Sequence, residues 1–161
     1  MQGFLRLMQL LSMVVWAGGL VFFAFVLAPT VFSPAVLSQV HGLALPAAIV
    51  GSTLRQLHWI GLISGLLFAV CVLALGLRSK LVKYELLAIV LMLLLTAFSQ
   101  FSIIPRMDRD RQQAGEIDSL PVSNAVRMHF DSLHQQSEKV EGLVMLCGLG
   151  LVVLVTSERN P

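Results

Sequence analysis

A polar segment, RMHFDSLHQQSEK at residues 127–139, runs without a proline into an apolar segment, VEGLVMLCGLGLVVLVT at residues 140–156. Both segments have helical periodicity, so one helix is predicted to begin in water and to end in lipid. A helix over residues 123–156 is about 50 Å long at 1.5 Å per residue, against a hydrocarbon core of about 30 Å. Roughly a third of it is therefore expected to stand outside the membrane.

The composition also indicates a membrane protein. Of the 161 residues, 57% are hydrophobic and 12% are charged, whereas soluble domains average roughly 25% charged residues. Four segments are long enough to cross a bilayer: residues 7–28, 57–77, 86–104 and 140–156. We predict one all-α domain over residues 1–161, an up-down four-helix transmembrane bundle with helical extensions on its outer side.

Two long connections, residues 29–56 and 105–139, join the spans on the outer side. Pro29 and Pro34 are expected to end the first helix, because proline lacks the backbone N–H that a continuing helix needs. Ser119 or Ser123 is expected to cap the last helix.

Basic residues near the spans set the predicted orientation. Arg78, Lys80 and Lys83 crowd the short connection between the second and third spans, so this connection and both termini are predicted to be cytoplasmic. The basic residues of the long connections lie on the opposite side, where they count less: Arg55, Arg106, Arg109, Arg111, Arg127 and Lys139. The net charge of +2 is spread over both signs, which indicates no nucleic-acid partner.

Two helix faces are expected to point into the bundle. Gln9, Ser12 and Trp16 share one face of the first helix, and polar residues avoid lipid unless they are bonded within the bundle. Gly61 and Gly65 share a face of the second helix with His58, and small residues allow a neighbouring backbone to approach closely.

Polar residues from three spans are predicted at one depth, at the outer mouth of the bundle: His58, Ser99, Gln100, His134, Glu138 and Glu141. Ionisable groups there are costly unless paired or hydrated, so the default hypothesis is a site for a small ligand or cation. His58, His134 and Glu138 are the candidate ligands of a divalent transition metal. His134 and Glu138 are four residues apart, which puts both on one helix face.

Two plainer interpretations stay open. In one, His58 only hydrogen-bonds a neighbouring carbonyl group. In the other, the charged residues form a structural polar network outside the membrane, made of Arg55, Arg106, Arg127 and Asp131. The sequence has no Gly-rich phosphate loop, no His-Glu-x-x-His motif and no nucleophile elbow, so an enzyme is the less expected class.

Several motifs extend over nearly the whole chain: Trp16-Ala-Gly18-Gly19, Leu57-His58-Trp59-Ile60-Gly61, Pro105-Arg106, and Arg127-x-x-Phe130-x-x-x-His134-x-x-Ser137. With these motifs the sequence resembles the transmembrane protein 205-like family, whose bacterial members form domain of unknown function 4149. The resemblance implies a four-span membrane protein without an established reaction.

The sequence is more distantly similar to copper-resistance D-type membrane proteins and to haem-binding membrane protoporphyrinogen oxidases. The latter have a His seven residues before a Trp on the first helix, and here that place holds Gln9. The resemblance therefore lacks one axial haem ligand, although His58 and His134 remain a candidate pair.

We therefore expect a non-enzymatic integral membrane protein of the bacterial inner membrane that binds a small ligand or metal cation at its outer polar site. The alternatives are a haem-binding redox protein and a structural subunit of a membrane complex. The expected partners are the lipid bilayer, the ligand or cation, and another membrane protein.

Overall fold

The structure is a computed structural model that describes residues 2–40, 42–76, 80–115 and 117–157. Its elements follow one another as α1 (Gln2–Phe22), η1 (Phe23–Leu27), α2 (Ala28–Val31), α3 (Pro34–Leu37), α4 (Ala44–Leu75), α5 (Lys80–Phe98), η2 (Ser99–Ile103), α6 (Ile104–Ala114), η3 (Ile117–Ser119) and α7 (Ala125–Ser157). The segments η1 and η2 are π-helical turns, and η3 is a 3₁₀ turn.

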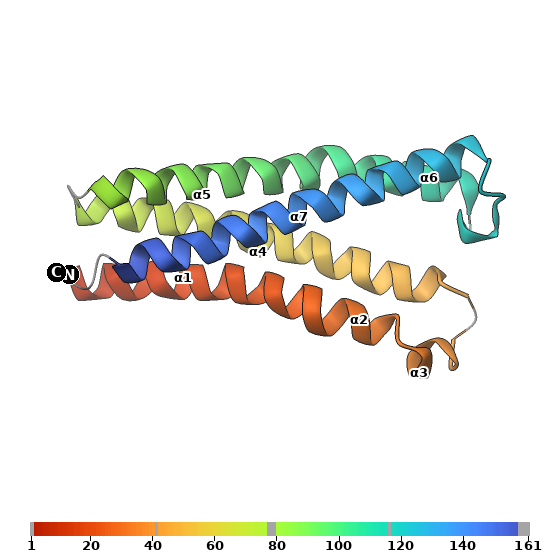
Figure 1. Ribbon diagram of the computed structural model, residues 1–161, viewed down its shortest axis with the longest axis horizontal. Coiled ribbons are helices and arrows are strands. Elements are labelled where there is room, and N and C mark those ends of the chain that lie inside the picture. Colours follow the sequence, from red (N-terminus) through yellow and green to blue (C-terminus); the bar gives the residue numbers. More distant parts are fainter. Residues whose placement is uncertain (1, 41, 77–79, 116, 158–161) are drawn as a thin grey trace.

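Four long helices run up and down the bundle (Figure 1). Each is long and apolar enough to cross a membrane, and their bounds are Gln2–Val31, Ala44–Leu75, Leu81–Ala114 and Ala125–Ser157. The prediction of an all-α membrane bundle is confirmed. The start of α1 and the end of α7 lie at one end of the bundle (Figure 1). This end is called the inner end below, after the predicted orientation, and the end with α3 and α6 is called the outer end.

The helical extensions are also as predicted. The helix α4 begins at Ala44, well before the apolar segment that starts at residue 57, and α7 begins at Ala125, well before residue 140. Both helices therefore stand partly outside the apolar part of the bundle.

The prediction that Pro29 and Pro34 end the first helix is wrong for Pro29, because the helix continues through it and ends at Val31, before Pro34. A π-helical turn precedes each of two prolines, at Phe23–Leu27 before Pro29 and at Ser99–Ile103 before Pro105. Proline lacks an N–H and its ring clashes with the carbonyl four residues back, and a wider turn relieves both problems. The helix therefore passes each proline.

The expected caps Ser119 and Ser123 are wrong as well. Oδ1 of Asn124 accepts hydrogen bonds from the backbone N–H groups of Val126 at 2.9 Å and Arg127 at 3.4 Å. Asn124 directly precedes Ala125, the first helical residue, so its side chain reaches the N–H groups that the helix leaves free.

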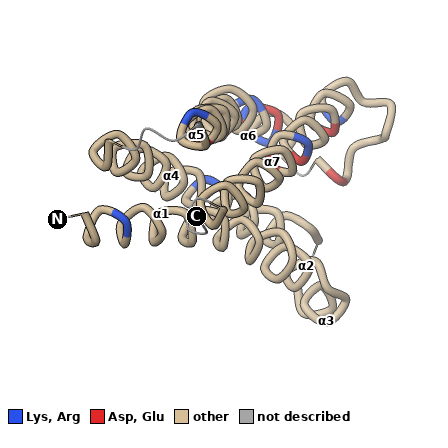
Figure 2. Tube along the Cα trace, turned by 60° about the vertical axis from the view of Figure 1, so that its left-hand side comes forward, with Lys and Arg blue, Asp and Glu red and all other residues tan. Residues whose placement is uncertain are grey.

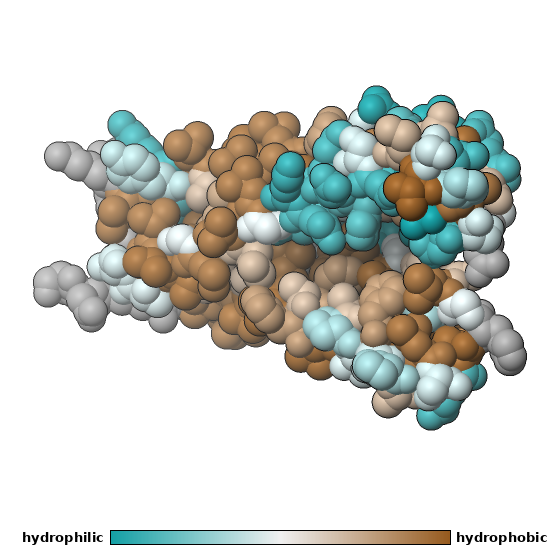
Figure 3. Space-filling model, turned by 45° about the vertical axis from the view of Figure 1, so that its right-hand side comes forward, coloured by the Kyte–Doolittle hydropathy of each residue, from teal (hydrophilic) through white to brown (hydrophobic). Residues whose placement is uncertain are grey.

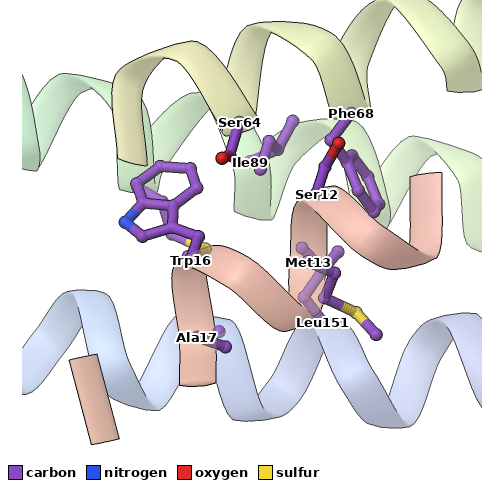
Figure 4. A pocket seen from close by; sticks show the side chains of 10 residues that line it. Ser12, Met13, Trp16, Ala17, Ser64, Phe68, Ile89 and Leu151 are labelled. Carbon is purple, nitrogen blue, oxygen red and sulfur yellow. The ribbon is translucent and has the colours of Figure 1, made fainter. Parts of the chain in front are cut away.

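Close contact between α1 and α4 occupies the middle of the bundle. Trp16 is buried, and its indole ring lies against Gly61 and Gly65, where a Cβ atom would overlap the ring. A cavity of about 10 Å³ lies beside Trp16, between Ser12, Ser64 and Met92 among others (Figure 4). It has room for about one water molecule.

The surface divides into an apolar part and a charged outer end. Hydrophobic residues cover most of the length of the bundle, and the largest hydrophilic group lies over α6 and the start of α7 (Figure 3). Most of the acidic and basic residues of the outer end gather on the same two helices (Figure 2). A small cluster of Ile103, Met107 and Leu133 holds α6 against α7 beneath these charges.

Candidate functional site

A buried polar site at the outer end joins three helices. Nδ1 of His58 in α4 lies 3.1 Å from Oε1 of Gln100 in η2, and Nε2 of His58 lies 2.7 Å from Oε1 of Glu141 in α7. The His58 side chain is 1% exposed and that of Glu141 is 16% exposed. These three residues are called the His58 site below. The sequence predicts all three at one depth in the bundle, and in the structure their side chains are in contact.

The local sequence explains how each side chain reaches the site. His58 lies three residues before Gly61, on the face by which α4 packs into the bundle. Gln100 belongs to the π-helical turn before Pro105, where one extra residue per turn shifts the side chains and Ser99, Gln100 and Ile103 are all buried. Glu141 lies beside the stripe of α7 that contains the buried Ser137 and Val144.

The hydrogen-bond geometry of the His58 site fits more than one protonation pattern, and two of them differ by one proton. With Glu141 ionised, the Nε2–H of His58 donates to its carboxylate. The Nδ1 atom then either carries a second proton and donates to Oε1 of Gln100, or accepts from the Gln100 amide after a rotation of that group. The first state is an ion pair without net charge, and the second has one negative charge.

Three buried oxygen atoms on the helices that form the His58 site have no hydrogen-bond partner among the residues that the structure describes: Oε2 of Glu141, Oγ of Ser99 and Oγ1 of Thr96. Ser99 adjoins Gln100 in the chain, and Thr96 lies one turn further in. A buried polar atom left without a partner costs about 1–3 kcal/mol, and a water molecule or a bound cation is one way to satisfy it. Thr96 is absent from the predicted site, although its spacing from Ser99 puts both on one stripe.

His134 and Glu138 lie outside the His58 site. Their side chains are 57% and 66% exposed, and Nε2 of His134 lies 3.4 Å from Oε1 of Glu138. The His134 ring stacks on Phe130 with 6.3 Å between the ring centroids. His134 lies two turns before Glu141 in α7, so helical periodicity puts the two residues near the same edge of the helix. At the level of His134 this edge is exposed to solvent.

The three candidate metal ligands do not converge. His58 is buried while His134 and Glu138 are exposed. Over the described ranges, no group of three or more His, Cys, Asp or Glu side chains is placed to hold a metal ion.

A second buried carboxylate, missed from the sequence, lies at the inner end. Glu85 of α5 is 0% exposed, and Nε2 of Gln9 in α1 donates to its Oε2 at 3.5 Å. Gln9 thus faces inward as expected. Glu85 precedes Ile89 and Met92 at helical spacing, and both are buried, so this shared stripe is the signal that predicts its burial.

Three of the four residues of the expected polar network, Arg55, Arg127 and Asp131, form ion pairs at the outer end. Arg55 of α4 pairs with Asp108 of α6, and Arg127 of α7 lies 3.9 Å from Asp131. Arg127 also donates to the backbone carbonyl group of Asp118 at 3.3 Å. Arg106 forms no ion pair within the part of the chain that the structure describes, so it stands apart from this network.

Fold and composition together define an integral membrane four-helix bundle with a polar site buried between three of its helices. Residues 11–116 match the family described as a domain of unknown function (DUF4149). The match covers more than half of the chain, so the protein belongs to this family, as the sequence motifs suggested for its bacterial members. The matched region contains His58 and Gln100, whereas Glu141 lies beyond it. No curated protein and no solved structure matches the chain.

Proposed function

We propose that this protein is a non-enzymatic integral membrane protein that binds a small cation at the His58 site. The observation that carries the proposal is the set of buried oxygens without described partners, on Glu141, Ser99 and Thr96. Carboxylate and hydroxyl oxygens are ligands for hard cations, and intramembrane ionisable residues commonly mark ion or proton pathways.

The charge of the site selects the class of cation. With His58 neutral and Glu141 ionised, the site has one negative charge, which one monovalent cation balances. With His58 doubly protonated, the imidazolium itself balances Glu141. A monovalent cation and the second imidazole proton therefore compete, and the occupied site is neutral in either case, as a low-dielectric environment requires.

The alternatives fit the geometry less well. Both ring nitrogens of His58 lie within hydrogen-bond distance of side chains, so neither is free to ligate a haem iron or a transition metal without first losing a partner. His134, the other candidate axial ligand, lies on the surface.

The distribution of basic residues supports one orientation in the membrane. We infer a bacterial inner membrane with both termini in the cytoplasm, so that the His58 site faces the outer side. Fusion of a periplasm-dependent reporter enzyme after residue 157 tests this orientation, and activity of that fusion would contradict it.

Cation binding is tested by thermal unfolding of the detergent-solubilised protein in sodium chloride and in choline chloride at equal ionic strength. Sodium at ten times its dissociation constant stabilises the folded protein by about 1.4 kcal/mol, which raises the midpoint by roughly 3–6 °C for a chain of this size. Glu141→Gln should abolish the difference between the salts. Glu138→Gln removes an exposed carboxylate from the same helix and should preserve it.

The same experiment separates the alternatives. If neither sodium, potassium nor lithium stabilises the wild-type protein relative to choline, and Glu141→Gln destabilises it equally in every salt, the site is structural and the proposal fails. A Soret absorption band that disappears in His58→Ala would instead identify a haem protein.

A further inference from the structure

A hollow of about 350 Å³ opens at the outer end, away from the His58 site. Four of its lining residues belong to α6 and one to α7: Arg106, Arg109, Asp110, Gln113 and His129. The α6 residues recur at spacings of three and four, so one face of that short helix borders the hollow. Figure 2 shows basic and acidic residues together on this part of α6.

The acidic residue of the hollow is already engaged. Asp110 is 8% exposed, and its Oδ2 lies 2.7 Å from Nδ1 of His129. This contact fixes the imidazole ring at the edge of the hollow, and the Nε2 atom donates to a ligand only when the ring carries a proton on both nitrogens. The contact also occupies one oxygen of the Asp110 carboxylate, and no arginine forms an ion pair with Asp110 among the described residues.

The two arginines of the hollow differ from the other three of the outer end. Arg55, Arg111 and Arg127 each lie within 4 Å of an aspartate. Arg106 and Arg109 form no ion pair among the described residues, and the Nε of Arg109 donates only to the backbone carbonyl of Pro105, at 3.4 Å. Two guanidinium groups therefore border one hollow without an ion-pair partner in the described part of the chain.

The depth of the hollow indicates where its ligand comes from. Arg106 follows Ile104 and Pro105, where the apolar segment of this helix ends, so the hollow lies where hydrocarbon gives way to water. Phosphate groups of lipids lie at this level, and soluble phosphates reach it from the water.

We propose that this hollow is a binding site for a phosphate group. Arginine presents a planar fork of N–H donors that matches two oxygens of a phosphate, and such charge-assisted bonds are among the stronger ones in proteins. The Gln113 amide supplies a further N–H donor. A phosphate held here ties α6 and α7 together at the membrane surface, and this site is independent of cation binding at His58.

The test uses the full-length protein and two probes. The first is spin-labelled phosphatidylglycerol in phosphatidylcholine vesicles that contain the protein, with spin-labelled phosphatidylcholine as the reference lipid. The second is inorganic phosphate, titrated calorimetrically into the protein in a detergent without phosphate. Wild-type protein should bind at least one probe, and Arg106→Gln/Arg109→Gln should weaken that binding by at least about tenfold, since hydrogen bonds to charged groups are lost.

The matched control removes the same net charge elsewhere. Arg6→Gln/Lys139→Gln takes two exposed basic residues from outside the hollow, and it should bind like the wild type. Arg106→Lys/Arg109→Lys keeps the charge but loses the planar fork, so it should bind with intermediate strength. A thermal-unfolding midpoint close to that of the wild-type protein verifies that each variant is folded.

Each outcome decides the question. Selective binding of phosphatidylglycerol without phosphate binding assigns the site to a lipid headgroup, and phosphate binding without lipid selectivity assigns it to a soluble phosphate. Binding of neither probe overturns the proposal. An equal loss in the Arg6→Gln/Lys139→Gln control also overturns it, because general charge attraction would then account for the binding.

Discussion

The contact between Trp16 and Gly61 gives a stability prediction that the structure makes quantitative. A Cβ atom at Gly61 lies 2.8 Å from Cε2 and 2.9 Å from Cδ1 of the Trp16 ring, whereas carbon atoms in contact are about 3.5–4.0 Å apart. The ring is 2% exposed, and its six-membered part lies against Gly65 one turn along the same helix, so it has little freedom to move. Gly61→Ala should cost about 1–3 kcal/mol through overpacking.

Helix propensity acts in the opposite direction, so the measurement needs a reference. Replacing a helical glycine by alanine gains about 1 kcal/mol in water, and this gain is common to every glycine inside a helix. Gly150 in α7 is a suitable reference, because no described atom lies within 4 Å of a Cβ atom at that position. The unfolding free energy of Gly61→Ala should therefore be about 1–3 kcal/mol below that of Gly150→Ala.

Unfolding in mixed micelles with a rising fraction of dodecyl sulfate measures both free energies. The same pair of substitutions is then made in a Trp16→Leu background, where the indole ring is gone. The difference should shrink to below about 0.5 kcal/mol, as expected when the interacting partner has been removed. Equal stability of Gly61→Ala and Gly150→Ala in the wild-type background would refute the packing argument.

Two further predictions concern buried and capping hydrogen bonds. His58→Ala and Glu141→Ala should each destabilise the protein by about 3–5 kcal/mol, since each leaves a buried partner unpaired, and the double variant should lose less than the sum. Additive losses in the same micelle assay would show that the two residues do not interact. Asn124→Ala should cost about 1 kcal/mol through the lost N-cap, while Ser123→Ala should be neutral, and a larger loss for Ser123→Ala would contradict the assigned cap.

The helical bundle is predictable from the sequence because it depends on the length of the apolar segments. The extension of α7 follows in the same way, since nothing between Arg127 and Thr156 interrupts the helical pattern. The exception is Pro29. Proline predicts the end of a helix in water, but inside an apolar span the chain keeps its hydrogen bonds by widening to a π-helical turn. No sequence pattern available here distinguishes these two responses.

The polar site is predictable in part. The depth of His58, Gln100 and Glu141 follows from their places within the apolar segments, and the structure joins them. The sequence also predicts His134 at this site, because helical periodicity gives the face on which a residue lies but not which neighbouring helix covers that face. The burial of Glu85 is hard to predict for a related reason. At the end of an apolar segment a carboxylate is normally assigned to water, and only its stripe with Ile89 and Met92 indicates burial.

The two buried carboxylates lie at different levels of the bundle, and the packing between them bears on how an ion could reach either one. Glu85 with Gln9 lies at the inner end, and Glu141 with His58 lies toward the outer end. Between these two levels Trp16 fills the space against Gly61 and Gly65, and the cavity beside it has room for about one water molecule. An ion that leaves the His58 site toward the inner end would have to separate α1 from α4 at this contact. The proposed cation binding at the His58 site needs no such movement, so the packed conformation is compatible with binding from the outer side.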